Sequence, residues 1–245
     1  MNPEPSSMNM QKKVHVIVCY FLKYLAKHVH FLVLSFFFST PTFAQLSGSI
    51  SFASDYVYRG SSLSHHTPVA QLNLNIDDPS GLFAGGFASK PMQNSTEPTG
   101  SHAIIYAGIA KRLASELTWE AGIKHATYTN TPNWSYNELF YGLSSEKLNL
   151  RLHYSPSYLG SKKDAKYIEL NSDLPLNETW SLTLHCGALF LQNQHSRIDT
   201  RISVKADFAP WIIQLAWNKN HQKTAKKYYE NKKTDTIVAT LSYTF

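Results

Sequence analysis

An alternation of apolar and polar residues with a period of two runs through almost all of the chain from residue 45 to residue 245. In the last segment one face carries Ile237, Ala239, Leu241, Tyr243 and Phe245, and the other carries Val238, Thr240, Ser242 and Thr244. A period of two is that of a β-strand, and no stretch of this region keeps the 3.6-residue period of a helix. The sequence therefore predicts an all-β fold.

Twelve segments of roughly ten residues show this alternation. They cover residues 48–59, 67–77, 81–90, 101–112, 116–128, 136–145, 147–155, 164–173, 178–191, 197–208, 211–219 and 234–245. Short turns and longer, more polar loops alternate between them. An even number of strands with short turns at one end and long loops at the other is typical of a transmembrane antiparallel up-and-down β-barrel, closed by pairing of the first and last strands. A soluble β-sandwich also alternates but does not predict this rhythm of connections.

The first 44 residues have the character of a secretory signal peptide. Basic residues lie before a short apolar run at 31–38, and small residues precede Ala44, after which we expect cleavage. The apolar run is too short for a membrane-spanning helix. Cleavage would remove four lysines and one glutamate, which lowers the formal net charge from +6 to +3. We therefore expect residues 45–245 to form one barrel, exported to the outer membrane of a Gram-negative bacterium.

Aromatic residues gather near both ends of the predicted strands. They make up 13% of the chain, whereas charged residues make up only 16%, against about 25% in an average soluble domain. One group, at the short-turn ends, comprises Trp119, Trp180, Phe208, Trp211 and Phe245; the other comprises Tyr56, Tyr58, Tyr154, Phe190 and Trp217. Two aromatic belts are expected where a barrel meets the two surfaces of a bilayer. The terminal Tyr-Thr-Phe also resembles the strand that outer-membrane barrel assembly machinery recognises.

Strand parity turns charged side chains of both signs into the barrel. The candidates for lining the lumen and selecting solutes are Asp55, Arg59, Glu120, Lys124, Glu138, Arg151, Glu169, Arg201 and Lys205. They could simply satisfy one another in a closed interior, or they could face a wet passage. Twelve strands lie between filled small barrels and wide porins, which favours a narrow, passive channel for small polar or charged solutes.

Two other functions stay open. A structural or surface-binding barrel would have a lumen plugged by its own charges and would conduct nothing. A barrel hydrolase would need a nucleophile beside a histidine; Asp199 and Ser203 could contribute, but no Gly-x-Ser-x-Gly motif is present. His65 and His66 lack the further ligands of a metal site, so we expect no metal and no cofactor.

The expected partners follow from location and charge. The last loop and its flanks carry Lys219, Lys223, Lys226, Lys227, Lys232 and Lys233. A position at the outer membrane argues against nucleic acid and favours lipopolysaccharide phosphates or anionic solutes. We also expect contacts with outer-membrane lipid and, during insertion, with the barrel assembly machinery.

Several motifs resemble those of the TorF-family porins, a proteobacterial family also known as Gcw-chp. The motifs are Ser54-Asp-Tyr-Val-Tyr-Arg-Gly60, Pro68-Val-Ala-Gln71, Pro79-Ser-Gly-Leu-Phe-Ala-Gly85 and Ser135-Tyr-Asn-Glu-Leu-Phe-Tyr-Gly142. The resemblance covers residues 48–145 well and the rest by strand pattern. It implies an outer-membrane barrel with a transport role and brings no catalytic residues. Ser64-His65-His66, where we expect more acidic character, and the lysine-rich last loop depart from the family pattern.

The first motif extends the first predicted strand. Parity places Asp55 and Arg59 on the lumen face and Tyr56 and Tyr58 on the lipid face. Four residues of extended chain separate Asp55 from Arg59 by about 13 Å, so each should find its partner on a neighbouring strand. Gly60 is expected to open the turn where the strand leaves the membrane.

Overall fold

The computed structural model describes residues 44–92, 100–113, 116–192, 196–222 and 234–245. The predicted signal peptide, except for Ala44, and most of the lysine-rich last loop lie outside these described residues. Among the residues described, no helix is long and apolar enough to cross a membrane.

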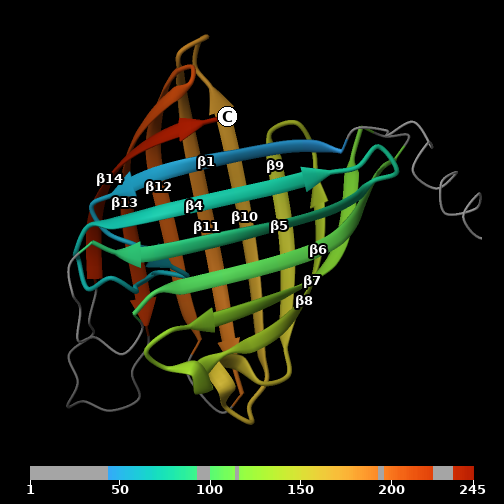
Figure 1. Ribbon diagram of the computed structural model, residues 1–245, viewed down its shortest axis with the longest axis vertical. Helices are drawn as coiled ribbons and strands as arrows, with labels where there is room; N and C mark the ends of the chain where they lie inside the picture. Colours follow the sequence, from blue (N-terminus) through green and yellow to red (C-terminus); the bar gives the residue numbers. More distant parts are fainter. Residues whose placement is uncertain (1–43, 93–99, 114–115, 193–195, 223–233) are drawn as a thin grey trace, which may run out of the picture. The chain divides into compact units, whose positions relative to one another are not determined.

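Twelve antiparallel strands form a closed barrel, as predicted (Figure 1). The wall strands are β1 (Gln45–Ala53), β4 (Val69–Asp77), β5 (Leu82–Pro91), β6 (His102–Arg112), β7 (Thr118–Tyr128), β8 (Tyr136–Ser144), β9 (Leu148–Ser155), β10 (Ala165–Pro175), β11 (Trp180–Leu191), β12 (Arg197–Phe208), β13 (Trp211–Gln222) and β14 (Thr234–Thr244). Each strand pairs with the next in this order, and β1 closes the ring on β14. The predicted closure by the first and last strands is confirmed.

The strands turn their apolar faces outward and their polar faces inward. Ile105, Ile123 and Leu139 are 64%, 60% and 57% exposed on the outer surface, whereas Glu138 and Ser203 are 3% and 1% exposed inside. A soluble barrel has the opposite distribution. The wall is therefore that of a transmembrane barrel, in which the lipid-facing and lumen-facing residues alternate along each strand.

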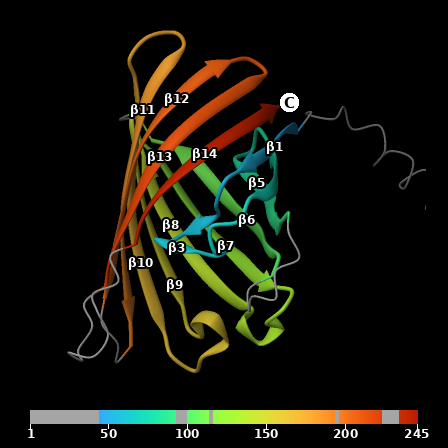
Figure 2. The same ribbon diagram turned by 90° about the vertical axis from the view of Figure 1, so that its left-hand side faces the viewer.

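The prediction for the first strand is wrong at its end, because β1 stops at Ala53 rather than at residue 59. Ser54 still bonds to β14. Its backbone N–H donates to the carbonyl of Ala239 (2.9 Å), and the N–H of Ala239 donates to Ser54 Oγ (3.0 Å). Residues 54–68 then turn into the interior, where they form what we call the inserted hairpin (Figure 2).

The inserted hairpin contains two short strands, β2 (Val57–Tyr58) and β3 (Ser61–Ser62), which form a separate two-stranded sheet. Arg59 and Gly60 connect them with φ angles of 47° and 72°. Two positive φ values in a two-residue loop define a type I′ turn, a conformation that glycine adopts at little cost. Gly60 is therefore in a turn, as predicted, but this turn lies inside the barrel.

The two tyrosines of the first motif face the interior, which corrects their predicted position on the lipid face. Tyr56 is 9% exposed, and its ring centroid lies 5.5 Å from that of Phe87 and 5.8 Å from that of His102. The hydroxyl groups of Tyr58 and Tyr136 lie 3.2 Å apart. Because the hairpin places both rings inside the barrel, they do not contribute to an aromatic belt.

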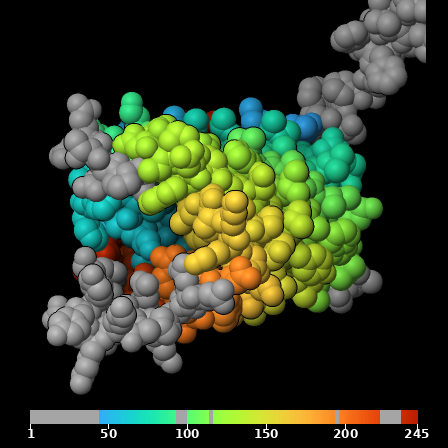
Figure 3. All heavy atoms as spheres, turned by 90° about the horizontal axis from the view of Figure 1, so that it is seen from below, coloured from blue at the N-terminus to red at the C-terminus, as the bar shows by residue number. Residues whose placement is uncertain are grey.

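Two loop segments lie against each other at the long-loop end of the barrel. The 3₁₀ turns η1 (Pro132–Trp134) and η2 (Tyr158–Gly160) meet where Gly160, at a φ of 64°, comes against the carbonyl of Asn133. Tyr158 packs beneath them against Tyr136, with ring centroids 4.8 Å apart. In the view from below, described atoms of these segments cover much of that end (Figure 3).

Alternate labelling along β9 tests the orientation of the wall. In a Cys186→Ser background, a water-soluble maleimide is expected to modify Asn149→Cys in lipid-embedded barrel but not Leu150→Cys, because Asn149 faces the lumen and Leu150 faces lipid. Labelling is measured by mass spectrometry, with Leu148→Cys as a second lipid-facing control. Equal modification at positions 149 and 150 would contradict the register.

Candidate functional site: the charged interior

The centre of the interior is a clamp between the tip of the inserted hairpin and β8. Arg59 donates to both carboxylate oxygens of Glu138, each at 2.8 Å, and Lys124 of β7 lies 2.7 Å from the same carboxylate. The side chains of Arg59, Glu138 and Lys124 are only 5%, 2% and 12% exposed. A bidentate pair with a second cation is strong and specific in geometry.

Aromatic rings pack against the guanidinium of Arg59. Its central carbon lies 4.3 Å from the ring centroid of Tyr167 on β10 and 5.5 Å from that of Tyr158 in η2. Such stacking adds a favourable cation–π contribution. Burial raises the pKa of the phenols of Tyr56 and Tyr158, which lie outside the wall strands, so both stay protonated at neutral pH.

The polar network continues around the wall from Glu138. His153 Nδ1 lies 3.6 Å from Glu138, and His153 Nε2 lies 3.1 Å from Glu169. His185 then lies between Glu169, at 4.0 Å, and Asp199, at 2.8 Å. The network thus links five consecutive strands, β8 to β12, on the inner face of the barrel.

The base of the inserted hairpin has its own anchor. The carboxylate of Asp55 accepts hydrogen bonds from the hydroxyl groups of Ser62 (2.6 Å) and Ser64 (2.7 Å) and lies 2.9 Å from His66 Nδ1. Asp55 is 3% exposed. The prediction that Asp55 finds its partner on a neighbouring strand is wrong, since these partners belong to the hairpin itself.

The other predicted residues also lie inside the barrel, and most are paired. Arg151 Nη2 lies 2.6 Å from Glu120, and Lys205 Nζ lies 2.7 Å from Asp173. Arg201 has no hydrogen bond or ion pair with any described residue. The structure therefore joins Arg59, Lys124, Glu138 and Glu169 in one network and places Arg151 with Glu120 and Lys205 with Asp173 in separate pairs. It gives Arg201 no partner among the described residues.

Asp199 was considered from the sequence only as a hydrolase candidate, and its place in the charge network was not predicted; it accepts from the Tyr167 hydroxyl at 3.2 Å and also contacts His185. Parity could have found it, because Asp199 lies two residues before Arg201 on the same strand and the same face. Tyr158 was missed as well, and no sequence signal marks this loop residue as part of the interior.

The inserted hairpin separates the interior into two parts. On one side, Tyr58 and Arg59 line a cavity of about 160 Å³ with Lys124, His153 and Glu169. On the other side, the same two residues line a pocket of about 60 Å³. That side is filled by a buried cluster of Ala126, Tyr128, Tyr136, Tyr158, Ala165, Tyr167 and Leu189.

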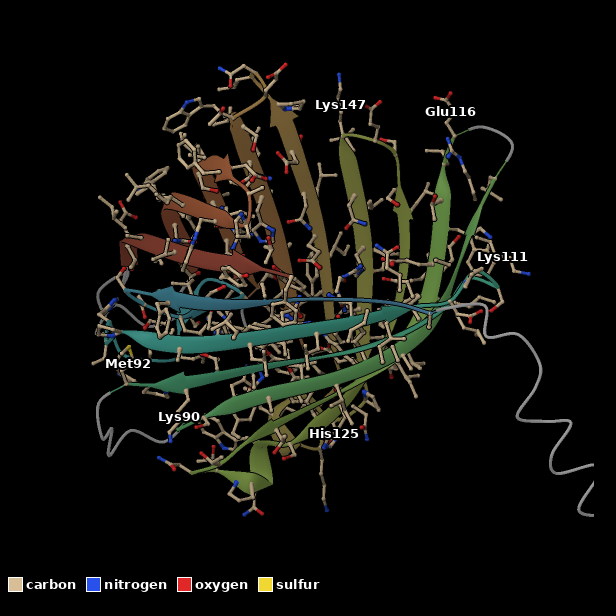
Figure 4. All side chains as sticks on the ribbon, turned by 45° about the horizontal axis from the view of Figure 1, so that its top comes forward. Lys90, Met92, Lys111, Glu116, His125 and Lys147 are labelled. Carbon is tan, nitrogen blue, oxygen red and sulfur yellow. The ribbon has the colours of Figure 1, made fainter. Side chains whose placement is uncertain are left out.

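A wider vestibule of about 330 Å³ opens toward the short-turn end, lined by Glu146 and Lys147 at its rim and by Asn171 and Arg201 further in. Figure 4 shows Lys147 and Glu116 near this end, with Lys90 and Met92 toward the opposite one. The vestibule is thus on the side of the hairpin away from the aromatic cluster.

The described interior offers little for covalent chemistry. His185, the histidine paired with Asp199, has its other hydrogen bonds with Asn171 and Tyr167, and Ser203 bonds instead to Thr183 and Gln214. Among the residues described, no three His, Cys, Asp or Glu side chains form a group that could hold a metal ion. The arrangement can bind, orient and exclude charged solutes.

The fold is that of the outer-membrane porins. It is similar to the KdgM porin (TM-score 0.54, 10% identity, covering 81% of this chain and 99% of that one) and the NanC porin (TM-score 0.55, 10% identity, 81% and 99%). It is also similar to an outer membrane channel from Pseudomonas putida F1 (TM-score 0.50, 12% identity, 84% and 96%).

Residues 39–245 match the family described as a bacterial protein of unknown function (Gcw_chp), and the chain belongs to this family. The predicted family resemblance is confirmed. A search of curated proteins finds no match.

Proposed function

We propose that this protein is an outer-membrane channel for small polar or charged solutes, held closed by its inserted hairpin. One observation carries the proposal: within the described ranges, β2 and β3 pair with each other and with no wall strand, and the tip of the hairpin is tied to the wall through the side chain of Arg59. The hairpin can therefore move aside without breaking any of the strand pairs that close the barrel.

The polar lining supports passage of such solutes. The vestibule and the central cavity are bordered by amides, hydroxyl groups and charges of both signs, which can replace water around a small solute. Passage would be passive and need no cofactor. The similar structures are called porins or a channel, and that likeness supports the same class of function here.

The same proposal includes location and partners. We expect the signal peptide, residues 1–44, to be removed and the barrel to lie in the outer membrane among lipids and lipopolysaccharide after insertion by the assembly machinery. The outward apolar faces support it, as do Trp180 and Trp211, 44% and 46% exposed near the short-turn end. Fractionation of membranes, with mass spectrometry of the mature N-terminus, tests this part.

A non-conducting barrel is the second candidate. It is favoured by the buried aromatic cluster, in which Tyr128 and Leu189 are 2% and 1% exposed and which fills the long-loop end of the lumen. In that case the charge network would only stabilise the interior.

A shortened barrel decides between the two candidates. Ala53 and Val69 are cross-strand partners, so replacing residues 55–67 with Gly-Gly joins β1 to β4 through a four-residue turn. In planar bilayers the wild type is expected to be mostly closed, and the shortened barrel is expected to show discrete conductance steps because its plug is gone.

The control for this experiment is heat-modifiable gel migration, which reports a folded barrel before any recording. A shortened barrel that folds but stays silent would contradict the channel and favour the non-conducting candidate.

A further inference from the structure

Arg201 stands apart from the other predicted basic residues of the interior. Arg59 and Lys124 share Glu138, Arg151 pairs with Glu120, and Lys205 pairs with Asp173. Arg201 alone of these has no carboxylate or hydrogen-bond acceptor within the described part of the chain. Its guanidinium presents a fork of donors that fits a carboxylate in bidentate fashion.

Polar side chains surround Arg201 at one level of the wall. Its cross-strand partners are His185 on β11 and Asn218 on β13. The same row continues to Asn171 on β10, opposite His185, and to Asn149 on β9, opposite Asn171. Amides both donate and accept, so this row can bind hydroxyl groups beside a carboxylate held by Arg201.

Arg201 is reached from the short-turn end. Arg201 and Asn171 line both the vestibule and the central cavity, so a solute that enters the vestibule meets them before it meets the hairpin. Arg201 is also exposed to the lumen. A cation that no described residue pairs, on the route between the vestibule and the inserted hairpin, is a natural first contact for an anion.

The carboxylates that line the same cavity are already engaged. Glu169 contacts His153 at 3.1 Å, and Asp199 contacts His185 at 2.8 Å while accepting from Tyr167. They are therefore poorly placed to take Arg201 as a partner.

We propose that the row around Arg201 is a binding site for small hydroxylated carboxylates that enter from the short-turn end. Arg201 holds the carboxylate, and Asn171 and Asn218 bind hydroxyl groups. This site deepens the proposed channel function and rests on it for its role in transport, although binding itself needs only a folded barrel. The central cavity of about 160 Å³ limits the occupant to a small molecule.

Calorimetric titration of the folded, detergent-solubilised barrel tests the site with gluconate as the probe and glucose as its uncharged counterpart. Gluconate is expected to bind and glucose to bind at least about tenfold more weakly, because a hydrogen bond to a charged group is lost. Arg201→Gln is expected to raise the Kd for gluconate by about tenfold or more, and Arg201→Lys by less, since lysine keeps the charge without the fork.

Arg197→Gln is the matched control. Arg197 lies on the same strand and the same face but lines the pocket on the other side of the hairpin, so its replacement should leave gluconate affinity within about twofold of wild type. Absence of gluconate binding by the wild type, equal binding of glucose, or equal losses from Arg197→Gln and Arg201→Gln would each overturn the site.

The proposed channel and the proposed binding site can be overturned independently of each other. A shortened barrel that conducts, together with a wild type that does not bind gluconate, would overturn the site and leave the channel. A shortened barrel that is folded and silent, together with gluconate binding that depends on Arg201, would overturn the channel and leave the site as a binding function.

Discussion

Replacing Glu138 with glutamine is expected to lower the free energy of unfolding of the barrel by about 3–5 kcal/mol, the usual cost of removing one partner from a buried ion pair. The carboxylate of Glu138 is the acceptor for both Arg59 and Lys124, and its side chain is 2% exposed. Glutamine fills the same space but carries no charge, so two cations would remain in the interior without an anion.

Glu120→Gln provides a graded comparison for this prediction. Glu120 serves one cation, Arg151, and both side chains are more exposed, at 15% and 34%, so its replacement should cost about 1 kcal/mol. Unfolding in urea, followed by tryptophan fluorescence of detergent-refolded protein, measures both. Equal stability of the two variants would contradict the prediction that the clamp contributes more to stability than the Glu120–Arg151 pair.

A double substitution tests whether Glu138 acts through the hairpin. Adding Arg59→Ala to Glu138→Gln removes one of the two unpaired cations, so the double variant should be less destabilised than the sum of the two single variants. Simple additivity would show that Arg59 and Glu138 do not stabilise each other.

The wall could be predicted from the sequence because a β-barrel with lipid on one side and polar groups on the other imposes the same alternation on every strand. In β9, Leu148, Leu150 and Leu152 face lipid while Asn149 and Arg151 face the lumen. No tertiary contact is needed to derive this pattern, since the two environments differ along the whole strand.

The inserted hairpin could not be separated from the first strand by the same reasoning. Residues 54–59 continue the alternation of β1, with Tyr56 and Tyr58 at the positions of an aromatic belt. In the structure Tyr56 packs against Phe87 of β5, and both tyrosine rings pack against His102 of β6. Such contacts are invisible in a single segment. The local signal that was present is Arg59-Gly60 followed by two serines, which suits a tight turn.

The sequence also could not predict which side chains pair inside the lumen. Parity places Arg59 and Glu138 inside, but they are 79 residues apart, and nothing in their segments specifies that they meet. The pairing depends on how far the hairpin reaches across the barrel. Arg201 illustrates the same limit, because the absence of a partner for it among the described residues is evident only when the neighbouring strands are in place.

Gly60→Ala is expected to shift the hairpin toward a displaced, conducting state. Gly60 has a φ of 72°, and a Cβ atom there would lie 2.6 Å from the Cβ of Asp199. Backbone strain and this overlap together should cost about 2 kcal/mol in the closed state, which corresponds to about a 30-fold rise in the ratio of open to closed channels. Single-channel recording in planar bilayers measures that ratio directly.

Gly86→Ala is the matched control for Gly60→Ala, since it makes the same chemical change where there is room. The nearest atom to a Cβ at Gly86, the carbonyl oxygen of Ile104, is 3.7 Å away, an ordinary contact. It should therefore leave the open fraction unchanged. If Gly60→Ala folds and stays as closed as Gly86→Ala, the hairpin does not control passage, because a close approach of its turn to Asp199 on β12 would have been disturbed without effect.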